Sequence, residues 1–122
     1  VDVRDGADGK KVPVFWSLGN FVSGQIEKPR MLGGMAKLTL ENTGDACKVT
    51  EYSLTPLVTH RAPNPSMSVY KLSDYTEELA SQNAIRNAPG CGDFTLQYCY
   101  DLVGQILGEG FDANEGILKG TL

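Results

Sequence analysis

The sequence is poor in the residues that build disulfide frameworks and metal sites. It contains three cysteines and one histidine, His60. An odd number of cysteines allows at most one internal disulfide, so at least one thiol stays free within the chain. No two of the cysteines form a C-x-x-C pair, and their spacing with a single histidine does not predict a tetrahedral zinc site. The sequence therefore predicts neither a disulfide scaffold nor a zinc module.

Positive charge and long apolar runs are also scarce. Eleven Lys and Arg against fifteen Asp and Glu leave a formal charge of -4. That sign is unfavourable for contacts with phosphates, which argues against a general nucleic-acid-binding protein. No apolar run reaches the roughly eighteen residues that span a bilayer. The 122 residues, 41% of them hydrophobic, predict one globular domain or a part of one.

The residue pattern of the chain changes from strand-like to helical at the proline-rich stretch 62–66. We expect residues 1–61 to be rich in strands and residues 62–110 to be helical. Residues 111–122 have weak periodicity and two glycines, which indicates a loosely held tail or one short strand. The fold class that we predict is α+β, with a mostly antiparallel sheet of about four strands followed by two helices.

The first half shows three strand patterns. Two Asp-Gly steps in 5–10 predict a hairpin turn between strands at 1–4 and 12–17. Residues 36–41 alternate apolar and polar, as in a strand with one buried face. Alternation continues from Thr50 and changes phase after Pro56, which cannot donate to a ladder. We interpret this run as a long antiparallel strand with a bulge, at an edge of the sheet.

The second half carries two helical patterns. Asp74 stands three residues before Glu77, which is typical of a helix start, and predicts a helix over about 73–83. A second helix is expected from Asp93, because apolar residues recur at helical spacing up to Leu107. Gly108 follows and should end it.

The segment 14–25, V-F-W-S-L-G-N-F-V-S-G-Q, carries the most information. An apolar strand leads into the pair Gly19-Asn20, which places polar groups at the carboxyl end of a strand. The alternative is a purely structural role, in which Asn20 only closes the turn. The S-L-G-N-F core resembles the signature of the bacterial capsule synthesis protein CapA family (PGA_cap, poly-γ-glutamate capsule). Segments 34–40, 52–61 and 69–75 resemble its C-terminal third in order, so the likeness covers about residues 1–86.

This resemblance implies a metallophosphoesterase-like αββα sandwich, of which residues 1–122 would be the C-terminal part. The chain begins at Val1, already in strand-like sequence, so we expect it to be a piece of a longer protein. The family's metal ligands would lie upstream, which implies divalent metal ions in the parent and no cofactor in this piece. The parent would act in poly-γ-glutamate capsule biosynthesis outside the cytoplasm, at the cell surface or anchored to the membrane.

Two functions stay open at this stage. The parent is either a metal-dependent phosphoesterase-like hydrolase, with this piece inactive, or the piece is a non-catalytic module that binds a polymer or a partner. Asn20 would line the rim of the site, and Lys28, Arg30 and Arg61 would meet an anionic polymer such as poly-γ-glutamate. A solvated loop is the simpler interpretation of the basic residues. His60 has no sequence neighbours that suit a metal site, so we expect a solvated or hydrogen-bonded histidine.

Separation from the rest of a parent sheet would leave strand edges unpaired. Such edges pair readily with other chains. We therefore expect contacts with the remainder of the parent chain and a homo-oligomer through an exposed sheet edge.

Overall fold

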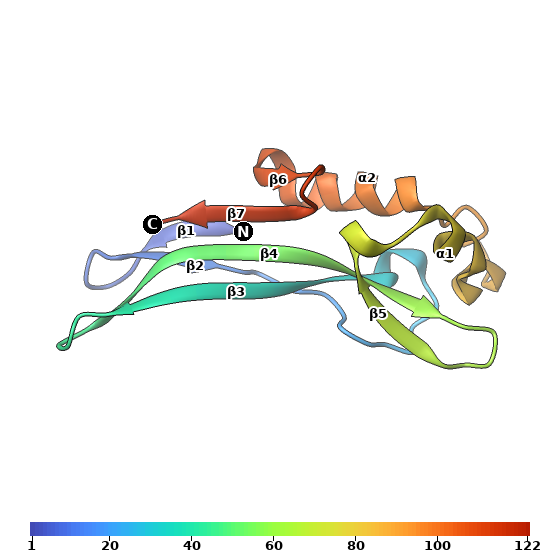
Figure 1. The fold of residues 1–122 in the computed structure, drawn as a ribbon, viewed down its shortest axis with the longest axis horizontal. Helices are drawn as coiled ribbons and strands as arrows, with labels where there is room; N and C mark the ends of the chain where they lie inside the picture. The colour runs from blue at the N-terminus through green and yellow to red at the C-terminus, as the bar shows by residue number, and fades with distance from the viewer.

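The computed structural model describes residues 1–122 and confirms the α+β class, with a mostly antiparallel sheet and two α-helices (Figure 1). A separate two-stranded hairpin precedes the main five-stranded sheet. The elements are β1 (Asp2–Asp5), β2 (Lys11–Val14), β3 (Leu32–Asn42), β4 (Cys47–Arg61), β5 (Met67–Lys71), α1 (Glu77–Gln82), α2 (Leu96–Leu107), β6 (Phe111–Asp112) and β7 (Ile117–Thr121).

The main sheet has the order β3-β4-β7-β6, and β5 also pairs with β4. Its centre is the fifteen-residue strand β4, which pairs with β3 along one side and with β7 and β5 along the other. The prediction that this strand lies at an edge is therefore wrong. The irregularity in pairing lies opposite Thr39 and Leu40 of β3, and the predicted bulge at Pro56 is wrong as well.

Pro56 is accommodated inside β4 because no strand pairs with this position on the side of β4 that faces away from β3. β7 pairs with residues 51–54 and β5 with residues 57–61, so Pro56 falls between the two partners. On the other side Pro56 faces Gly34, whose N–H points away from β4. No ladder bond needs a donor at this position, which lets a proline occupy a central strand.

The predicted hairpin is confirmed as β1 paired antiparallel with β2, although β2 ends at Val14 rather than Ser17. The predicted strand at 36–41 is the outer half of β3. Two strands were not expected as strands. β5 lies where the sequence pointed to a helix entry, and β6 lies in the tail. Of the two alternatives for the tail, the strand is observed: β7 joins the sheet beside β4.

The first predicted helix is broken into short pieces. A 3-10 turn covers Leu72–Asp74, α1 spans only Glu77–Gln82, and a second 3-10 turn covers Ala84–Asn87. Thr76, not Asp74, caps α1 by accepting the N–H of Leu79. These local turns end each piece before a long helix can form.

The second helix is confirmed, but it begins at Leu96 instead of Asp93, because the Thr95 hydroxyl accepts the N–H of Tyr98. Gly108 ends the helix with a φ of 68°, the left-handed region that favours glycine.

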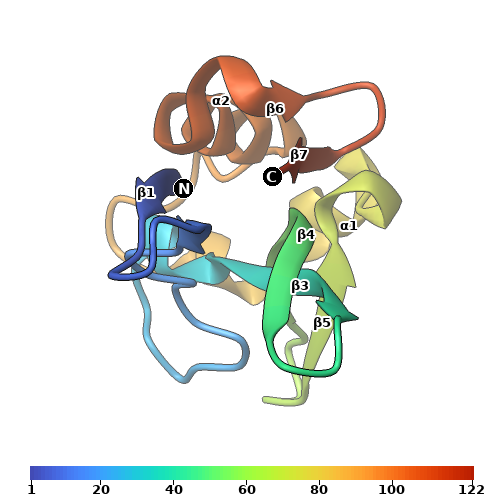
Figure 2. The ribbon, with the colours of Figure 1, turned by 90° about the vertical axis from the view of Figure 1, so that its left-hand side faces the viewer.

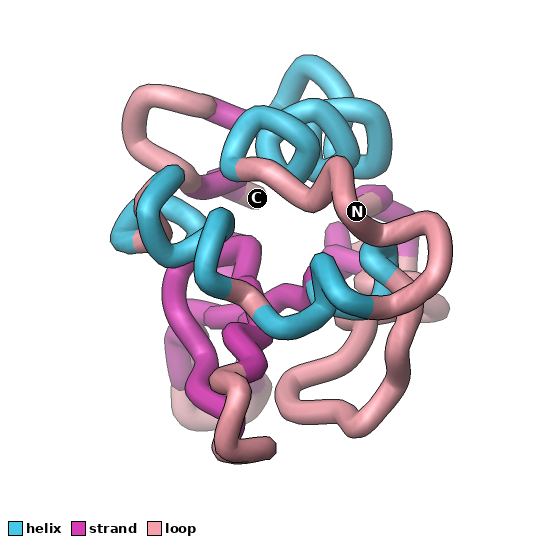
Figure 3. The backbone as a smooth tube through the Cα atoms, turned by 90° about the vertical axis from the view of Figure 1, so that its right-hand side faces the viewer, coloured by secondary structure: helices cyan, strands magenta, loops and turns pink.

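The core fills one end of the molecule, between the sheet and the helical segments. Figure 2 views the molecule from the tip of the β3–β4 hairpin, and Figure 3 shows the helical segments gathered at the opposite end. The buried cluster draws on the 3-10 turns, both helices and the inner ends of β3 and β4: Met31, Leu32, Val58, Leu72, Tyr75, Ala80, Ile85, Cys91, Phe94, Cys99 and Val103. The β3–β4 arm extends away from this core, and the outer half of β3 is largely exposed in it (Figure 1).

Candidate functional site

The S-L-G-N segment crosses the edge of β3 at its beginning. The Leu18 carbonyl accepts the N–H of Gly34 at 2.6 Å, and Gly19 forms an antiparallel bridge with Gly33. The Ser17 hydroxyl accepts the N–H of Gly19 at 3.2 Å, which tightens the turn. The segment therefore pairs with the first residues of β3 and covers this part of the sheet edge.

Glycine is required on both sides of this crossing. Gly19 has a φ of 66°, and a Cβ there would lie 3.0 Å from the carbonyl oxygen of Leu32. A Cβ at Gly33 would collide with the backbone carbonyl of Asn20. The motif and the Gly33-Gly34 pair thus form one close backbone contact, although they are separate in sequence.

Asn20 is half-buried and its side chain is used within the chain. Its Nδ2 donates to Gln25 Oε1 at 3.0 Å and to the carbonyl of Arg30 at 3.3 Å. These bonds tie the loop after the motif to the turn before β3. The geometry matches the alternative in which Asn20 closes a turn, and it also places Asn20 beside the backbone of Arg30.

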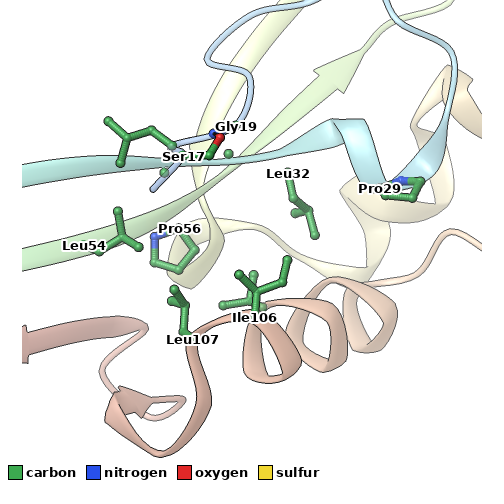
Figure 4. A pocket seen from close by; sticks show the side chains of 12 residues that line it. Ser17, Gly19, Pro29, Leu32, Leu54, Pro56, Ile106 and Leu107 are labelled. Atoms are coloured by element: carbon green, nitrogen blue, oxygen red, sulfur yellow. Dashed lines mark hydrogen bonds between the residues drawn. The ribbon is translucent and has the colours of Figure 1, made fainter. Parts of the chain in front are cut away.

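An apolar cavity of about 270 Å³ lies next to the motif, between α2 and the sheet. In Figure 4, Leu32 and Pro56 face Ile106 and Leu107 across this space, and Ser17 and Gly19 lie at its far side. No ionisable side chain lines it. The cavity can hold apolar groups, but it offers no acid, base or metal ligand.

Two of the predicted basic residues are held by carboxylates of the same chain. Lys28 Nζ lies 2.7 Å from both carboxylate oxygens of Asp93 and stacks on the ring of Tyr98. Arg30 pairs with Glu27 at 3.0 Å. Arg61 is half-buried, and no hydrogen bond or ion pair joins it to the other three predicted residues. The structure brings Asn20 and Arg30 together and leaves Arg61 apart.

His60 is hydrogen-bonded, as the sequence predicted. Its Nδ1 lies 2.9 Å from the hydroxyl of Tyr75. Asn83 is almost fully buried, and its Nδ2 donates to the carbonyl of Thr59 and to Tyr75 Oη, both at 3.1 Å. Its Oδ1 accepts the N–H groups of Ile85 and Arg61. Every polar atom of Asn83 is thereby satisfied, so this network stabilises the junction between β4 and the helices.

The network also fixes which groups carry protons. Because Asn83 donates to the Tyr75 oxygen, the Tyr75 hydroxyl is free to donate to a neutral Nδ1 of His60. Burial lowers the pKa of His60 and raises the pKa of Tyr75. The two rings are therefore neutral near pH 7, and the arrangement serves structure more than proton transfer.

A row of lysines that the sequence did not predict lies on the sheet face turned away from α2. Lys37 of β3, Ser53 of β4 and Lys119 of β7 lie directly opposite one another across three strands. Lys71 of β5 lines the same shallow hollow of about 640 Å³, together with the hydroxyls of Thr39, Ser53, Thr55 and Thr121. The strand register brings these lysines together, and only the alternation around Lys37 was visible in the sequence.

The charges on this open face are mostly unpaired. Lys37 and Lys71 have no carboxylate partner, whereas Lys119 is paired with Glu115. Glu51 is the one carboxylate that lines the hollow, and it accepts a hydrogen bond from Thr39 at 3.2 Å. The face is thus locally positive on a chain whose formal charge is -4. We call Lys37, Lys71 and Lys119 the lysine face.

Metal ligands do not gather anywhere in residues 1–122. No group of three or more His, Cys, Asp or Glu side chains lies close enough together to hold a metal ion. The residues present do not fit the metal centre that the family resemblance implies for a parent, and no metal-dependent step is assigned to them. None of the helices has the length and apolar character needed to traverse a bilayer.

Comparison with known proteins found no match among family profiles, curated proteins or solved structures.

Proposed function

We propose that this chain is the polymer-binding C-terminal part of a CapA-like protein of poly-γ-glutamate capsule biosynthesis. The resemblance of segment 14–25 supports the family, and the lysine face supports the binding role. In this proposal the parent acts outside the cytoplasm, and residues 1–122 take no part in catalysis. Hydrolysis by a metal-dependent, phosphoesterase-like parent is proposed from the resemblance alone; bound metal and phosphodiesterase activity of the full-length protein test it.

The observation that carries the binding role is the row Lys37, Ser53 and Lys119 across three strands. Neighbouring strands lie about 4.8 Å apart, so two ammonium groups in this row can face carboxylates spaced along an extended polymer. The threonine and serine hydroxyls between them can donate to further carboxylates. An elongated, shallow and positive face suits a flexible polyanion better than a small substrate.

Lys28, Arg30 and Arg61 are weaker candidates for the same role. Contact of Lys28 and Arg30 with a polymer would first require them to leave Asp93 and Glu27. Lys37 and Lys71 have no such competing partner. Polymer binding through Lys37 and Lys71 therefore breaks no existing ion pair, and only Lys119 would have to leave its carboxylate partner, Glu115.

The direct test is titration of the protein with poly-γ-glutamate of defined length at low and high salt. Exposed ion pairs contribute about 0.5 kcal/mol each. Replacing Lys37, Lys71 and Lys119 by Ala should therefore weaken binding about tenfold. Raising the salt should weaken wild-type binding, because the contacts are exposed.

A matched control has the same change in charge. Replacing Lys10, Lys11 and Lys48 by Ala removes three lysines that are paired with Asp8, Asp5 and Glu41. This control should bind nearly as well as wild type. An equal loss of affinity in both triple variants would contradict polymer binding at the lysine face. So would binding that disappears only when Lys28, Arg30 and Arg61 are replaced.

A further inference from the structure

The outer edge of β3 has no partner over most of its length. β4 pairs with one side of β3 from Leu32 to Asn42. On the other side, Leu18 and Gly19 contact only Gly33 and Gly34. Residues 35–42 therefore present unpaired backbone groups on a strand that contains no proline, and such an edge is a template for another strand.

We infer that two copies of this chain pair along this edge as an antiparallel, two-fold symmetric dimer centred on Thr39. The pairing joins two five-stranded sheets into one continuous sheet. It shares Lys37 with the lysine face, but it requires only the backbone of β3 and the side chains along it.

The direction of the free backbone groups limits the possible registers. The N–H of Gly34 points to Leu18, away from β4. Because direction alternates along a strand, Ala36, Leu38 and Leu40 also point their N–H and C=O groups outward. Outward residues of one copy must face outward residues of the other, so Leu38 can pair with Leu38 or Leu40 but not with Thr39.

Charge selects one register from this set. With the two-fold axis at Thr39, Lys37 of each copy faces Glu41 of the other, which gives two cross-strand pairs of opposite charge. An axis at position 37 or 41 would set like charges against each other, and an axis at 38 or 40 leaves both charges without an opposite partner. Glu41 already contacts Lys48 at 2.8 Å, and its carboxylate has acceptor sites for a second ammonium.

Apolar side chains favour the same register. Leu38 and Leu40 are 46% and 60% exposed. In the Thr39-centred register Leu38 of each copy lies opposite Leu40 of the other, so four leucines meet on one face of the joined sheet. Burying these side chains supplies the apolar contact that an edge pairing needs in water.

A cysteine scan tests the register. The background is Cys47→Ser, because Cys47 is an exposed free thiol. In the Thr39→Cys variant the two new thiols face each other across the axis in a non-hydrogen-bonded pair, with Cα atoms about 4.5 Å apart. That spacing suits a disulfide. A glutathione redox buffer should convert Thr39→Cys to a disulfide-linked dimer. The single variant Lys37→Cys should form little disulfide-linked dimer.

The double variant Lys37→Cys with Glu41→Cys should also cross-link, because these positions face each other between copies. Equal cross-linking of the single variants at 37 and 39 would overturn the register.

Sedimentation velocity over a concentration series tests the dimer without cross-linking. Wild type should shift from monomer to dimer, and Lys37→Glu should raise the dimer Kd at least tenfold, since it places Glu beside Glu41 twice. Circular dichroism confirms that the variant is folded, and a folded Lys37→Glu that dimerises like wild type would overturn the inference. A wild-type protein that remains monomeric at millimolar concentration would also overturn it.

Discussion

At the scale of single residues, Gly33 lies so close to segment 17–20 that a Cβ there would collide with the Asn20 carbonyl. Gly33→Ala should destabilise the fold by about 2 kcal/mol, because segment 17–20 and β3 must move apart to admit a methyl group. Urea unfolding measures the loss. Gly24→Ala is the matched control, since open space surrounds that position, and it should change stability little. Similar values for the two variants would show that segment 17–20 is not packed on β3.

The His60 network predicts a dependence of stability on pH. In the unfolded chain the histidine pKa is about 6.5, and in the folded protein burial lowers the pKa of His60. The unfolded state therefore binds more protons just below pH 6.5, so stability should fall as the pH drops from 7 to 5. Protonation would also place a second donor against the Tyr75 hydroxyl. Thermal unfolding in this range should show a slope that His60→Gln reduces, and an unchanged slope would contradict the network.

At the scale of elements, the helices depend on threonine caps. The Thr95 hydroxyl accepts the N–H of Tyr98 at 3.0 Å at the start of α2. Thr95→Ala should cost about 1 kcal/mol of stability, and Thr95→Ser should restore most of it. Chemical denaturation of the two variants makes the comparison. If Ala and Ser behaved alike, the cap would not contribute.

The sequence predicted those elements whose signals are local. The Asp-Gly steps of 5–10 specify the first hairpin, and Gly108 ends α2 where expected. Asp74 and Asp93 resembled caps, but Thr76 and Thr95 hold those positions. An acidic residue and a threonine nearby both suit a helix start, so only the observed hydrogen bond distinguishes them.

The position of β4 in the sheet could not be predicted from its own sequence. Pro56 indicated an edge, yet it fits a central strand because β7 and β5 divide the opposite side between them. That arrangement depends on residues 67–71, where the sequence predicted helix rather than strand, and on residues 117–121, which carry weak signals and lie far away in the chain.

At the scale of the whole molecule, the basic residues predicted from the sequence differ from those that the structure brings together. Lys28, Arg30 and Arg61 were predicted to meet an anionic polymer because their cationic groups suit carboxylates, but Lys28 and Arg30 are each paired with a carboxylate of the chain. Lys37, Lys71 and Lys119 come from three strands and converge only when the register is known. Residues that come together through the pairing of different strands form no short motif in the sequence. The lysine face could therefore not be predicted from the sequence alone.

The two proposals at this scale share one residue. Lys37 belongs to the lysine face and also flanks the dimer axis at Thr39. In the dimer, Lys71 of each copy has no carboxylate partner and Lys119 keeps its exposed pair with Glu115, so both still face a polymer, while Lys37 lies beside Glu41 of the other copy. Polymer binding through Lys71 and Lys119 should therefore persist in the cross-linked Thr39→Cys dimer.

Binding of an anionic polymer by the lysine face can be followed residue by residue with backbone amide NMR. Isotope-labelled protein is titrated with poly-γ-glutamate, and the shifts of individual amides are followed. We expect the largest shifts at residues 37, 53, 71 and 119, with little change at 28, 30 and 61. Shifts confined to the loop around Lys28 and Arg30, or an unchanged spectrum at low salt, would contradict it.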